Sequence, residues 1–379
     1  MAEKKHICLI SCFYPPHVGG VERYVRNMAA QLSAMGHKIT LVCVNTESLE
    51  SYSNNNNIEI FRLPCYDIFK DRFPFLKKNK VYRELFEKLN DRKYDAIILN
   101  QRFYRITKTA VQLSEMTGTP LYLIEHVTGH FTVHNKILDF FGHIYEHRIT
   151  EFLKRYLKDA FGVSKACTKW LGHFEIKTGK ILYNGISKDQ IIDDEMNIHE
   201  QFSIPEKAHI FFHAGRLIEE KGILYMVEAF RHISKANENT YLIIAGQGPL
   251  YDKLKQEHHK NIILTGTIEH SKVLSIIKKS DCVLIPSYYP EGLPTLILEA
   301  GLCKTAVIST PMGGTTEIIR DGKNGLIVEK RSAEDLSKAM KRIISNDKLK
   351  NDLSGELHKK VISEFTWDKI CKKLIDFIS

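Results

Sequence analysis

The sequence lacks long apolar stretches, closely spaced cysteine pairs and a P-loop. No apolar run approaches the roughly 20 residues that cross a bilayer. The eight cysteines include no Cys-x-x-Cys pair and mostly lie in apolar runs, so we expect free buried thiols and neither a disulfide framework nor a zinc site made by them. The run Ile7–Phe13 follows Lys4-Lys5 and stops at Pro15-Pro16 without a small-residue cleavage site. We therefore expect a buried first strand there and not a secretion signal.

Two nucleotide-binding signatures and one metal signature are also missing. No Gly-x-x-x-x-Gly-Lys-Ser/Thr loop occurs, and Gly246-Gln247-Gly248 begins a dinucleotide fingerprint whose third glycine position holds Tyr251. These absences disfavour P-loop kinases and Rossmann oxidoreductases. No Asp-x-Asp pair follows a predicted strand, and the acidic run Asp193-Asp194-Glu195 lies in a polar segment. We therefore expect no metal site of the Asp-x-Asp type and no cofactor.

The composition is that of a soluble globular protein, with 43% hydrophobic and 26% charged residues among 379, and the length suggests two or three domains. The net charge of +9 is unevenly placed. Residues 1–185 carry 27 Lys+Arg against 18 Asp+Glu, whereas residues 186–379 carry 27 of each. This asymmetry indicates an anionic partner for the first half, or else a solvated basic face without a partner.

Short apolar runs alternate with helical periods throughout, which predicts α/β domains with parallel sheets covered on both faces. A helix is expected over Val21–Met35, and a polar Asn-rich turn over Ser53–Asn57. The boundary is expected near Asn184-Gly185, so the ligand site is predicted in the cleft between two doubly wound domains. The predicted strands are His6–Ser11, Lys38–Val44, Ile58–Leu63, Ala96–Asn100, Leu121–His126, Ala160–Val163, Ile181–Tyr183, Ile210–Ala214, Tyr241–Ala245, Ile262–Leu264, Cys282–Ile285, Ala306–Ile308 and Leu326–Val328.

Two glycine-containing turns follow predicted first strands. Gly19-Gly20 opens the first helix, where the backbone can approach a ligand and free N–H groups suit a phosphate. A tight strand-to-helix turn explains it equally well. Arg216 follows a strand of the second half and Lys221 is expected to begin the next helix. The two cations would neutralise a departing diphosphate, or would be ordinary surface charges.

The segment Pro286–Ala300 carries the strongest signal. A strand ends at Ser287, and a helix is expected to begin near Pro294, where its amides can hold a phosphate. Glu299 follows the apolar residues 296–298, so it is expected to be buried and to need partners such as a ribose diol, a backbone group or a cation. Glu291, in the preceding loop, would meet sugar hydroxyls or solvent.

Glu291 and Glu299, with seven residues between them, resemble the E-x7-E signature of retaining GT-B glycosyltransferases. The order and spacing of further motifs resemble family 4 of these enzymes over nearly the whole chain. These motifs include Pro-Pro-His-Val-Gly-Gly-Val-Glu near the start, Gly162-Val163-Ser164, Asn184-Gly185-Ile186, Gly215-Arg216 with Glu220-Lys221-Gly222, Ala245–Pro249, Pro286-Ser287 and Gly313-Gly314.

The resemblance implies two Rossmann-like domains facing a cleft: residues 1–185 on the acceptor side, 186–363 on the donor side, and a helix in 364–379 that returns to the first domain. It implies a metal-independent, retaining transfer of a sugar from a nucleotide sugar, with UDP expected before GDP. It also assigns roles by position: His126 to the active site, Glu291 to the transferred sugar, Glu299 to the ribose, Ile268 to the base, Arg216 and Lys221 to the diphosphate, Gly292, Leu293, Pro294 and Thr295 to the phosphate cradle, and Gly19 and Gly20 to the loop that closes on the donor.

Two other histidines, His130 and His134, lie close to His126 in the sequence. His126 is preferred as the active-site histidine because it ends a predicted strand. The departing phosphate is expected to help deprotonate the acceptor, so His126 would orient and stabilise the reacting groups.

The acceptor is expected to be a glycan or a polyprenyl-diphosphate-linked glycan, met by the basic first half. The segment Phe69–Arg83 mixes aromatic and cationic residues, which suits a peripheral contact with an anionic membrane or simply a loop and an amphipathic helix. A cytoplasmic enzyme, peripheral on the inner face of the plasma membrane, is the expectation, with no nucleic-acid partner. Two rivals remain: a UDP-sugar 2-epimerase of the same architecture, and a donor-binding subunit of low activity.

Overall fold

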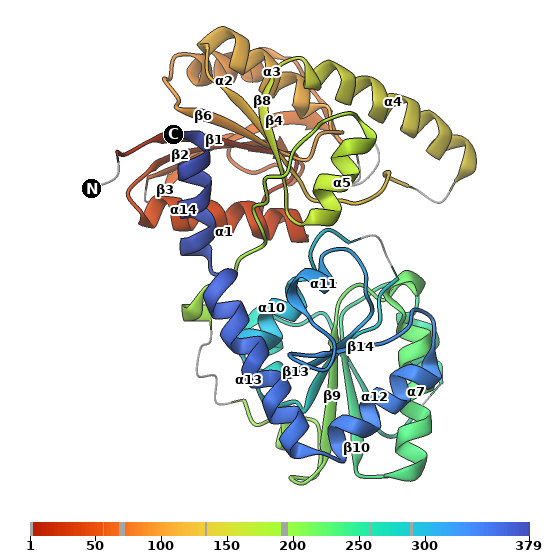
Figure 1. The fold of residues 1–379 in the computed structure, drawn as a ribbon. Helices are drawn as coiled ribbons and strands as arrows, with labels where there is room; N and C mark the ends of the chain where they lie inside the picture. Colours follow the sequence, from red (N-terminus) through yellow and green to blue (C-terminus); the bar gives the residue numbers. More distant parts are fainter. Residues whose placement is uncertain are drawn as a thin grey trace. The chain divides into compact units, whose positions relative to one another are not determined.

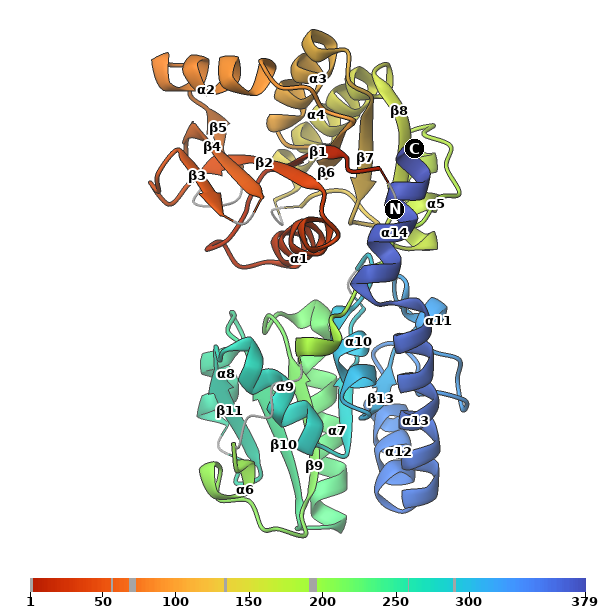
Figure 2. The same cartoon turned by 90° about the vertical axis from the view of Figure 1, so that its left-hand side faces the viewer.

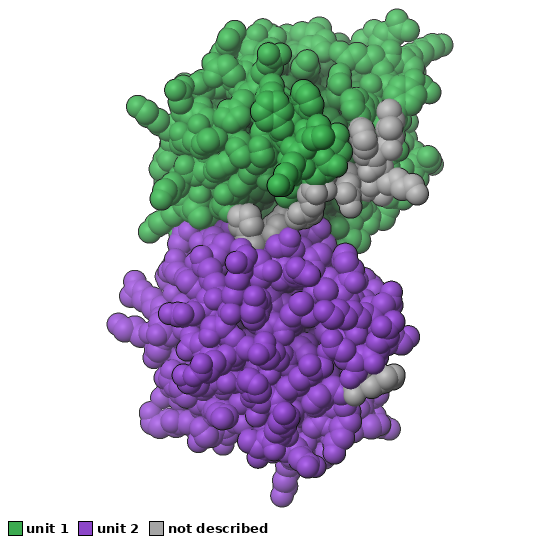
Figure 3. Space-filling model, turned by 90° about the vertical axis from the view of Figure 1, so that its right-hand side faces the viewer, with its two compact units in different colours: residues 1–185, 367–379 green, residues 186–366 purple. Residues whose placement is uncertain are grey.

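The structure is a computed structural model that describes residues 3–55, 57–67, 73–132, 135–190, 196–257, 259–288 and 291–379. The chain forms two compact units, coloured separately in Figure 3. Unit 1 comprises Met1–Gly185 and Trp367–Ser379, and unit 2 comprises Ile186–Thr366. The last segment joins unit 1 from Trp367 and not from residue 364, because helix α13 (Asp347–Glu364) continues to Glu364 within unit 2.

Unit 1 is built on a mostly parallel sheet. The parallel strands run in the order β4-β2-β1-β6-β7-β8, and β3 and β5 pair with β4 in the antiparallel sense. The bounds are β1 His6–Ser11, β2 Lys38–Asn45, β3 Tyr52–Asn55, β4 Ile58–Tyr66, β5 Phe75–Leu76, β6 Ala96–Asn100, β7 Leu121–Glu125 and β8 Leu157–Gly162.

Helices cover both faces of this sheet (Figures 1 and 2). Cys8 and Ile10 share one core cluster with side chains of α2, α3, α4 and α5, whereas Ile7 and Leu9 alternate with them and are also fully buried. The alternation of side chains along a strand places these on the other face, where α1 and α14 pack together. The helices are α1 Gly20–Ala34, α2 Lys80–Asn90, α3 Ile106–Thr117, α4 Lys136–Lys154, α5 Lys165–His173 and α14 Trp367–Ile378.

Unit 2 has a six-stranded parallel sheet in the order β11-β10-β9-β12-β13-β14. Helix α7 packs on α12, while α10 packs on α9 and α13. The strands are β9 His209–Ala214, β10 Thr240–Ala245, β11 Ile262–Gly266, β12 Cys282–Ile285, β13 Ala306–Ser309 and β14 Leu326–Ile327. The remaining helices are α6 Ile198–Gln201, α7 Ile223–Ala236, α8 Tyr251–Gln256, α9 His270–Lys279, α10 Thr295–Leu302, α11 Thr315–Ile318 and α12 Ala333–Ile344, with short 3-10 turns at Lys188–Gln190 and Glu219–Lys221.

Most predicted strands are confirmed, and three local predictions are wrong. Ile181–Tyr183 is not a strand, because only Ile181 makes a single bridge, to Gly162. The Asn-rich turn is largely strand β3, which pairs through its backbone at the sheet edge and leaves its polar side chains in solvent; Asn56 lies outside the described residues. Lys221 does not begin a helix, because the 3-10 turn ends there and α7 begins at Ile223.

The strand order determines where ligands bind. In unit 1 the order reverses between β1 and β6, and in unit 2 it reverses between β9 and β12. Open α/β sheets bind ligands at the carboxyl ends of strands at such switch points.

All eight cysteines are free thiols, seven of them buried, as expected. Within the described ranges, every helix is too short or too polar to span a bilayer.

Candidate functional site

The predicted diphosphate cation and the predicted sugar-binding carboxylate form an ion pair in unit 2. Strands β9 and β12 are neighbours, so the loops after them meet at one edge of the sheet. Lys221 Nζ lies 2.6 Å from Glu291 Oε1, and both side chains are largely shielded, with 20% and 17% exposed. Ser287 donates its hydroxyl hydrogen bond to the same carboxylate oxygen at 2.8 Å. The predicted functions of Lys221 and Glu291 are therefore physically linked.

Two glycines with positive φ allow the loops to approach each other this closely. A Cβ on Gly222 (φ +73°) would lie 2.1 Å from the carbonyl oxygen of Pro286, and one on Gly313 (φ +53°) would lie 1.9 Å from that of Glu291. Any larger residue at either position would push these loops apart. The backbone bond from Gly314 N–H to Gly292 O, 2.9 Å long, completes the junction.

Helix α10 begins directly after this junction. Its N-cap residue is Pro294, and no side chain among the described residues caps it. The first N–H groups of a helix carry partial positive charge and have no acceptor within the helix. The predicted phosphate cradle at Gly292–Thr295 is therefore a helix start whose amides suit an anion. Arg216, on the loop after β9, is exposed to solvent.

Glu299 is buried within α10, at 4% exposure, and its carboxylate is bound by His270. His270 Nε2 lies 2.9 Å from Glu299 Oε1. Because His270 is the first residue of α9, it also follows closely after Ile268, the predicted base-holding residue. The structure thus brings the predicted ribose and base sites together through a histidine that the sequence analysis missed. The sequence signal that could have found it is the position of His270 two residues after Ile268.

A second histidine of unit 2, His213, is buried near Lys221. It lies at the carboxyl end of β9 and donates its Nδ1–H to Leu284 O at 2.8 Å. Its buried Nε2 has no hydrogen-bond partner among the described residues. Burial lowers the pKa of His213 to about 4, and the nearby Lys221 cation contributes. The ring is therefore neutral at pH 7, with an acceptor nitrogen close to Gly215.

In unit 1, His126 directly follows β7. Its Nε2 lies 3.0 Å from Asn100 Oδ1, and the Asn100 amide donates to Ile10 O. This orientation of the amide means that Nε2 carries the ring proton, so Nδ1 carries the lone pair. Burial lowers the pKa of His126 to about 3, and the Tyr24 ring meets the imidazole edge to face at 4.7 Å. His126 is a neutral, firmly oriented imidazole at pH 7.

The other unit 1 prediction, the Gly19-Gly20 loop, sits at the start of α1. Gly19 is the N-cap, and a Cβ there would lie 2.1 Å from Glu22 Oε2. His17 approaches that carboxylate at 3.2 Å and stacks on Phe13. The start of α1, where a phosphate was predicted to bind, therefore already has the carboxylate of Glu22 beside it.

The remaining predicted features are the two histidines that compete with His126 and the acidic run at residues 193–195. His130 lies with other histidines and not with His126. His134 and Asp193-Asp194-Glu195 lie outside the described residues. A separate cavity of about 430 Å³, lined by residues such as Arg231 and Ile262, includes none of the predicted site residues.

Two Rossmann-like units, with glycine turns and charged loops at the carboxyl ends of their parallel strands and a C-terminal helix returning to the first unit, define the GT-B class of glycosyltransferases. The family "Glycosyltransferase Family 4" matches residues 18–190, and "Glycosyl transferases group 1" matches residues 194–359. The chain belongs to the glycosyltransferases that these two families describe.

Relatives extend over nearly the whole chain. An uncharacterised glycosyltransferase of Methanocaldococcus jannaschii is 26% identical over 376 residues, 95% of each chain. The GPI3 subunit of phosphatidylinositol N-acetylglucosaminyltransferase from Saccharomyces cerevisiae is 20% identical, covering 98% of this chain and 82% of its own. Anabaena HepE, solved with UDP and glucose, shares the fold with a TM-score of 0.76, 15% identity and 99% coverage of both chains.

Proposed function

We propose that this glycosyltransferase moves a sugar from a UDP-sugar to a glycan or lipid-linked glycan, with retention of anomeric configuration. The observation that carries the proposal is the Lys221–Glu291 pair beside the start of α10. A cation, a carboxylate and a helix start meet there, at the switch point of a parallel sheet. This combination suits a sugar diphosphate. The cation and the helix start favour the anionic diphosphate, and the carboxylate accepts hydrogen bonds from sugar hydroxyls.

The diphosphate is held by Lys221, Arg216 and the first amides of α10. In the transfer, the bond between the anomeric carbon and the β-phosphate oxygen breaks, and a bond to the acceptor oxygen forms on the same face. The acceptor proton passes to the departing phosphate oxygen. Charge grows on that oxygen in the transition state, where fixed cations and a helix dipole stabilise it most.

The remaining groups hold the nucleoside and the sugar. Glu299 accepts hydrogen bonds from the ribose hydroxyls, and His270 fixes the orientation of its carboxylate. The base lies against the backbone at Ile268. Glu291 accepts from hydroxyls of the transferred sugar while positioning Lys221. UDP is preferred to GDP, and the UDP bound to Anabaena HepE, which shares the fold, supports this choice.

His126 orients the sugar and does not act as a general base. A group whose pKa is lowered to about 3 by burial is too weak a base to remove a hydroxyl proton near pH 7. Its Nδ1 lone pair is available as a hydrogen-bond acceptor. We expect no metal ion in the transfer, because Arg216, Lys221 and α10 supply the positive charge.

Binding and turnover test the proposal separately. We expect UDP to raise the melting temperature of the purified chain, and Lys221→Ala to abolish the shift. Lys338→Ala is the matched control, because Lys338 pairs with Glu334 at the same 2.6 Å but is 65% exposed. The absence of any shift with UDP or GDP would contradict a nucleotide-sugar site.

Product analysis distinguishes transfer from isomerisation. With a synthetic prenyl-diphosphate monosaccharide as acceptor, UDP should be released only when both donor and acceptor are present, and at the same rate with or without added Mg²⁺. A 2-epimerase would instead convert the UDP-sugar without an acceptor. A rate raised severalfold by Mg²⁺ would refute metal-independent transfer.

We propose that unit 1 contacts the membrane through helix α4, while the predicted contact of Phe69–Arg83 stays a prediction. Residues 68–72 lie outside the described residues, and Phe73 packs against the unit 1 core. Helix α4 instead exposes a run of large apolar side chains that begins beside Lys136: Ile137, Leu138, Phe140, Phe141 and Ile144. An apolar helix face on a unit with excess positive charge suits shallow insertion into an anionic bilayer.

The yeast relative, which is named for transfer to phosphatidylinositol, supports a lipid-linked acceptor. We expect flotation with vesicles containing phosphatidylglycerol, weakened by salt and lost in Phe140→Ser/Phe141→Ser. Met116→Ser, which removes another exposed apolar side chain (56% exposed), should float like the wild type. Equal flotation of all three proteins would refute insertion through α4.

A further inference from the structure

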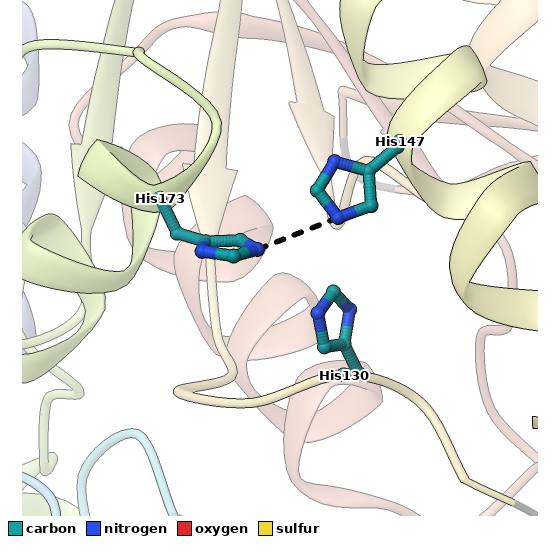
Figure 4. A group of neighbouring side chains, drawn as sticks. All are labelled: His130, His147 and His173. Carbon is teal, nitrogen blue, oxygen red and sulfur yellow. Dashed lines mark hydrogen bonds between the residues drawn. The ribbon is translucent and has the colours of Figure 1, made fainter. Parts of the chain in front are cut away.

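Three histidines from three different elements of unit 1 point toward a common centre (Figure 4). His130 lies in the loop after β7, His147 on α4, and His173 at the end of α5. One ring nitrogen from each lies within 4.8 Å of the others. The Nε2 atoms of His147 and His173 are 3.4 Å apart. The ring centroids form a nearly equilateral triangle, with separations of 5.4, 5.2 and 5.1 Å.

We propose that His130, His147 and His173 bind a divalent transition-metal ion, with Zn²⁺ the best fit. A tetrahedral zinc with Zn–N bonds of about 2.05 Å separates its nitrogen ligands by about 3.3 Å, close to the observed spacing of His147 and His173. Imidazole is a preferred ligand of zinc, copper and nickel, whereas magnesium and calcium favour oxygen. The site therefore selects for a transition metal.

A buried carboxylate orients His130 as a metal ligand. Its Nδ1 lies 2.8 Å from Glu146 Oε2, so Nδ1 donates the proton and Nε2 is left to bind a metal. Such carboxylate–histidine–metal arrangements fix the tautomer and raise the basicity of the ligand. Glu146 is itself anchored by the buried Arg102.

The buried charges behind His130 favour a cation. Arg102 is fully buried and bridges Glu125 and Glu146, so this group of three carries a formal charge of −1. A metal ion on the far side of His130 offsets that charge.

The arrangement is accessible and partly rigid before any ion arrives. His147 and His173 are exposed, so an ion can enter from solvent and one tetrahedral position remains for water. Trp170 stacks flat on His173 at 4.8 Å, with 4° between the planes. The ion would join the β7–α4 loop to α4 and α5.

The ion pairs of Arg102 also connect this site to His126, the residue after β7. Glu125, which pairs with Arg102, accepts the backbone N–H bonds of His126 and Val127. The metal would therefore stiffen the loop that carries His126. None of the donor-binding residues proposed in unit 2 belongs to this site, so zinc binding can be tested without measuring sugar transfer.

Metal content, and not activity, provides the test. The purified full chain is stripped with a chelator, dialysed, and titrated with Zn²⁺ against a fluorescent zinc indicator. We expect one equivalent of zinc per chain and a higher melting temperature on loading. Substitution of Co²⁺ should give the intense visible bands of a tetrahedral site.

Variants locate the site among 17 histidines. His147→Ala and His173→Ala should each weaken zinc binding at least tenfold, whereas His232→Ala, which removes an exposed histidine of α7, should bind like the wild type. Circular dichroism and gel filtration confirm the fold of each variant. Less than about a tenth of an equivalent bound by the wild type, or equal binding by all three variants, would overturn the proposal.

Discussion

Replacing Lys221 and Glu291 separately and together probes the donor side of unit 2. Their charged atoms lie 2.6 Å apart and are mostly shielded from solvent. Lys221→Ala leaves the Glu291 carboxylate without this cation, and Glu291→Ala frees the ammonium group to move. Each single change therefore damages both proposed contacts, one with the diphosphate and one with the sugar.

The contact between Lys221 and Glu291 determines the loss of turnover expected in the double variant. Loss of one transition-state contact costs about 10²-fold in turnover, or about 2.7 kcal/mol in the barrier. Two independent contacts would give about 10⁴-fold in the double variant. Because these side chains touch, we expect the double variant to lose only about 10²- to 10³-fold, a coupling of about 1.4–2.7 kcal/mol.

Initial rates measure this coupling, using the UDP-sugar that gives the largest thermal shift and a saturating acceptor. The control cycle uses Lys338 and Glu334, an exposed pair at the same distance, which should change no rate. A fully additive 10⁴-fold loss, or a near-normal rate in either single variant of the Lys221 pair, would refute the reasoning.

Three further predictions follow from other contacts. His270→Ala should raise the donor KM about tenfold with little change in kcat, since it loses a charged hydrogen bond to Glu299; a fall in kcat alone would contradict this. Burial lowers the pKa of His126 from 6.5 to about 3, so the unfolded chain binds the extra proton between these values and stability falls as pH drops below 6.5. Urea unfolding from pH 7 to pH 5 should show a shallower loss in His126→Asn, by up to about 1.4 kcal/mol per pH unit; identical slopes would mean that His126 is not buried. Gly313→Ala should be less stable than Gly322→Ala by about 2 kcal/mol in urea unfolding, because both have positive φ but only Gly313 would place its Cβ against the Glu291 carbonyl; equal losses would show that the loop yields.

Much of the fold follows from local patterns. The short apolar runs predict the strands of both units because parallel strands are buried on both faces and need no polar alternation. Glycine-containing loops that follow strands carry Gly19, Arg216 and Glu291. The predictions failed where neighbours decide the outcome: β3 is a polar strand that forms because β4 offers an edge, and Ile181–Tyr183 is an apolar run that gains only one bridge.

The sequence by itself determined which residue types stand at the ends of the strands, since backbone propensity and burial act over a few neighbouring residues. Only the tertiary structure decided which of them meet. Lys221 and Glu291 are 70 positions apart, and His270 and Glu299 are 29 apart. Their contacts depend on β9 lying beside β12 and α9 lying against α10. The histidines at 130, 147 and 173 likewise converge because one loop and two helices pack together, a juxtaposition that no local pattern encodes.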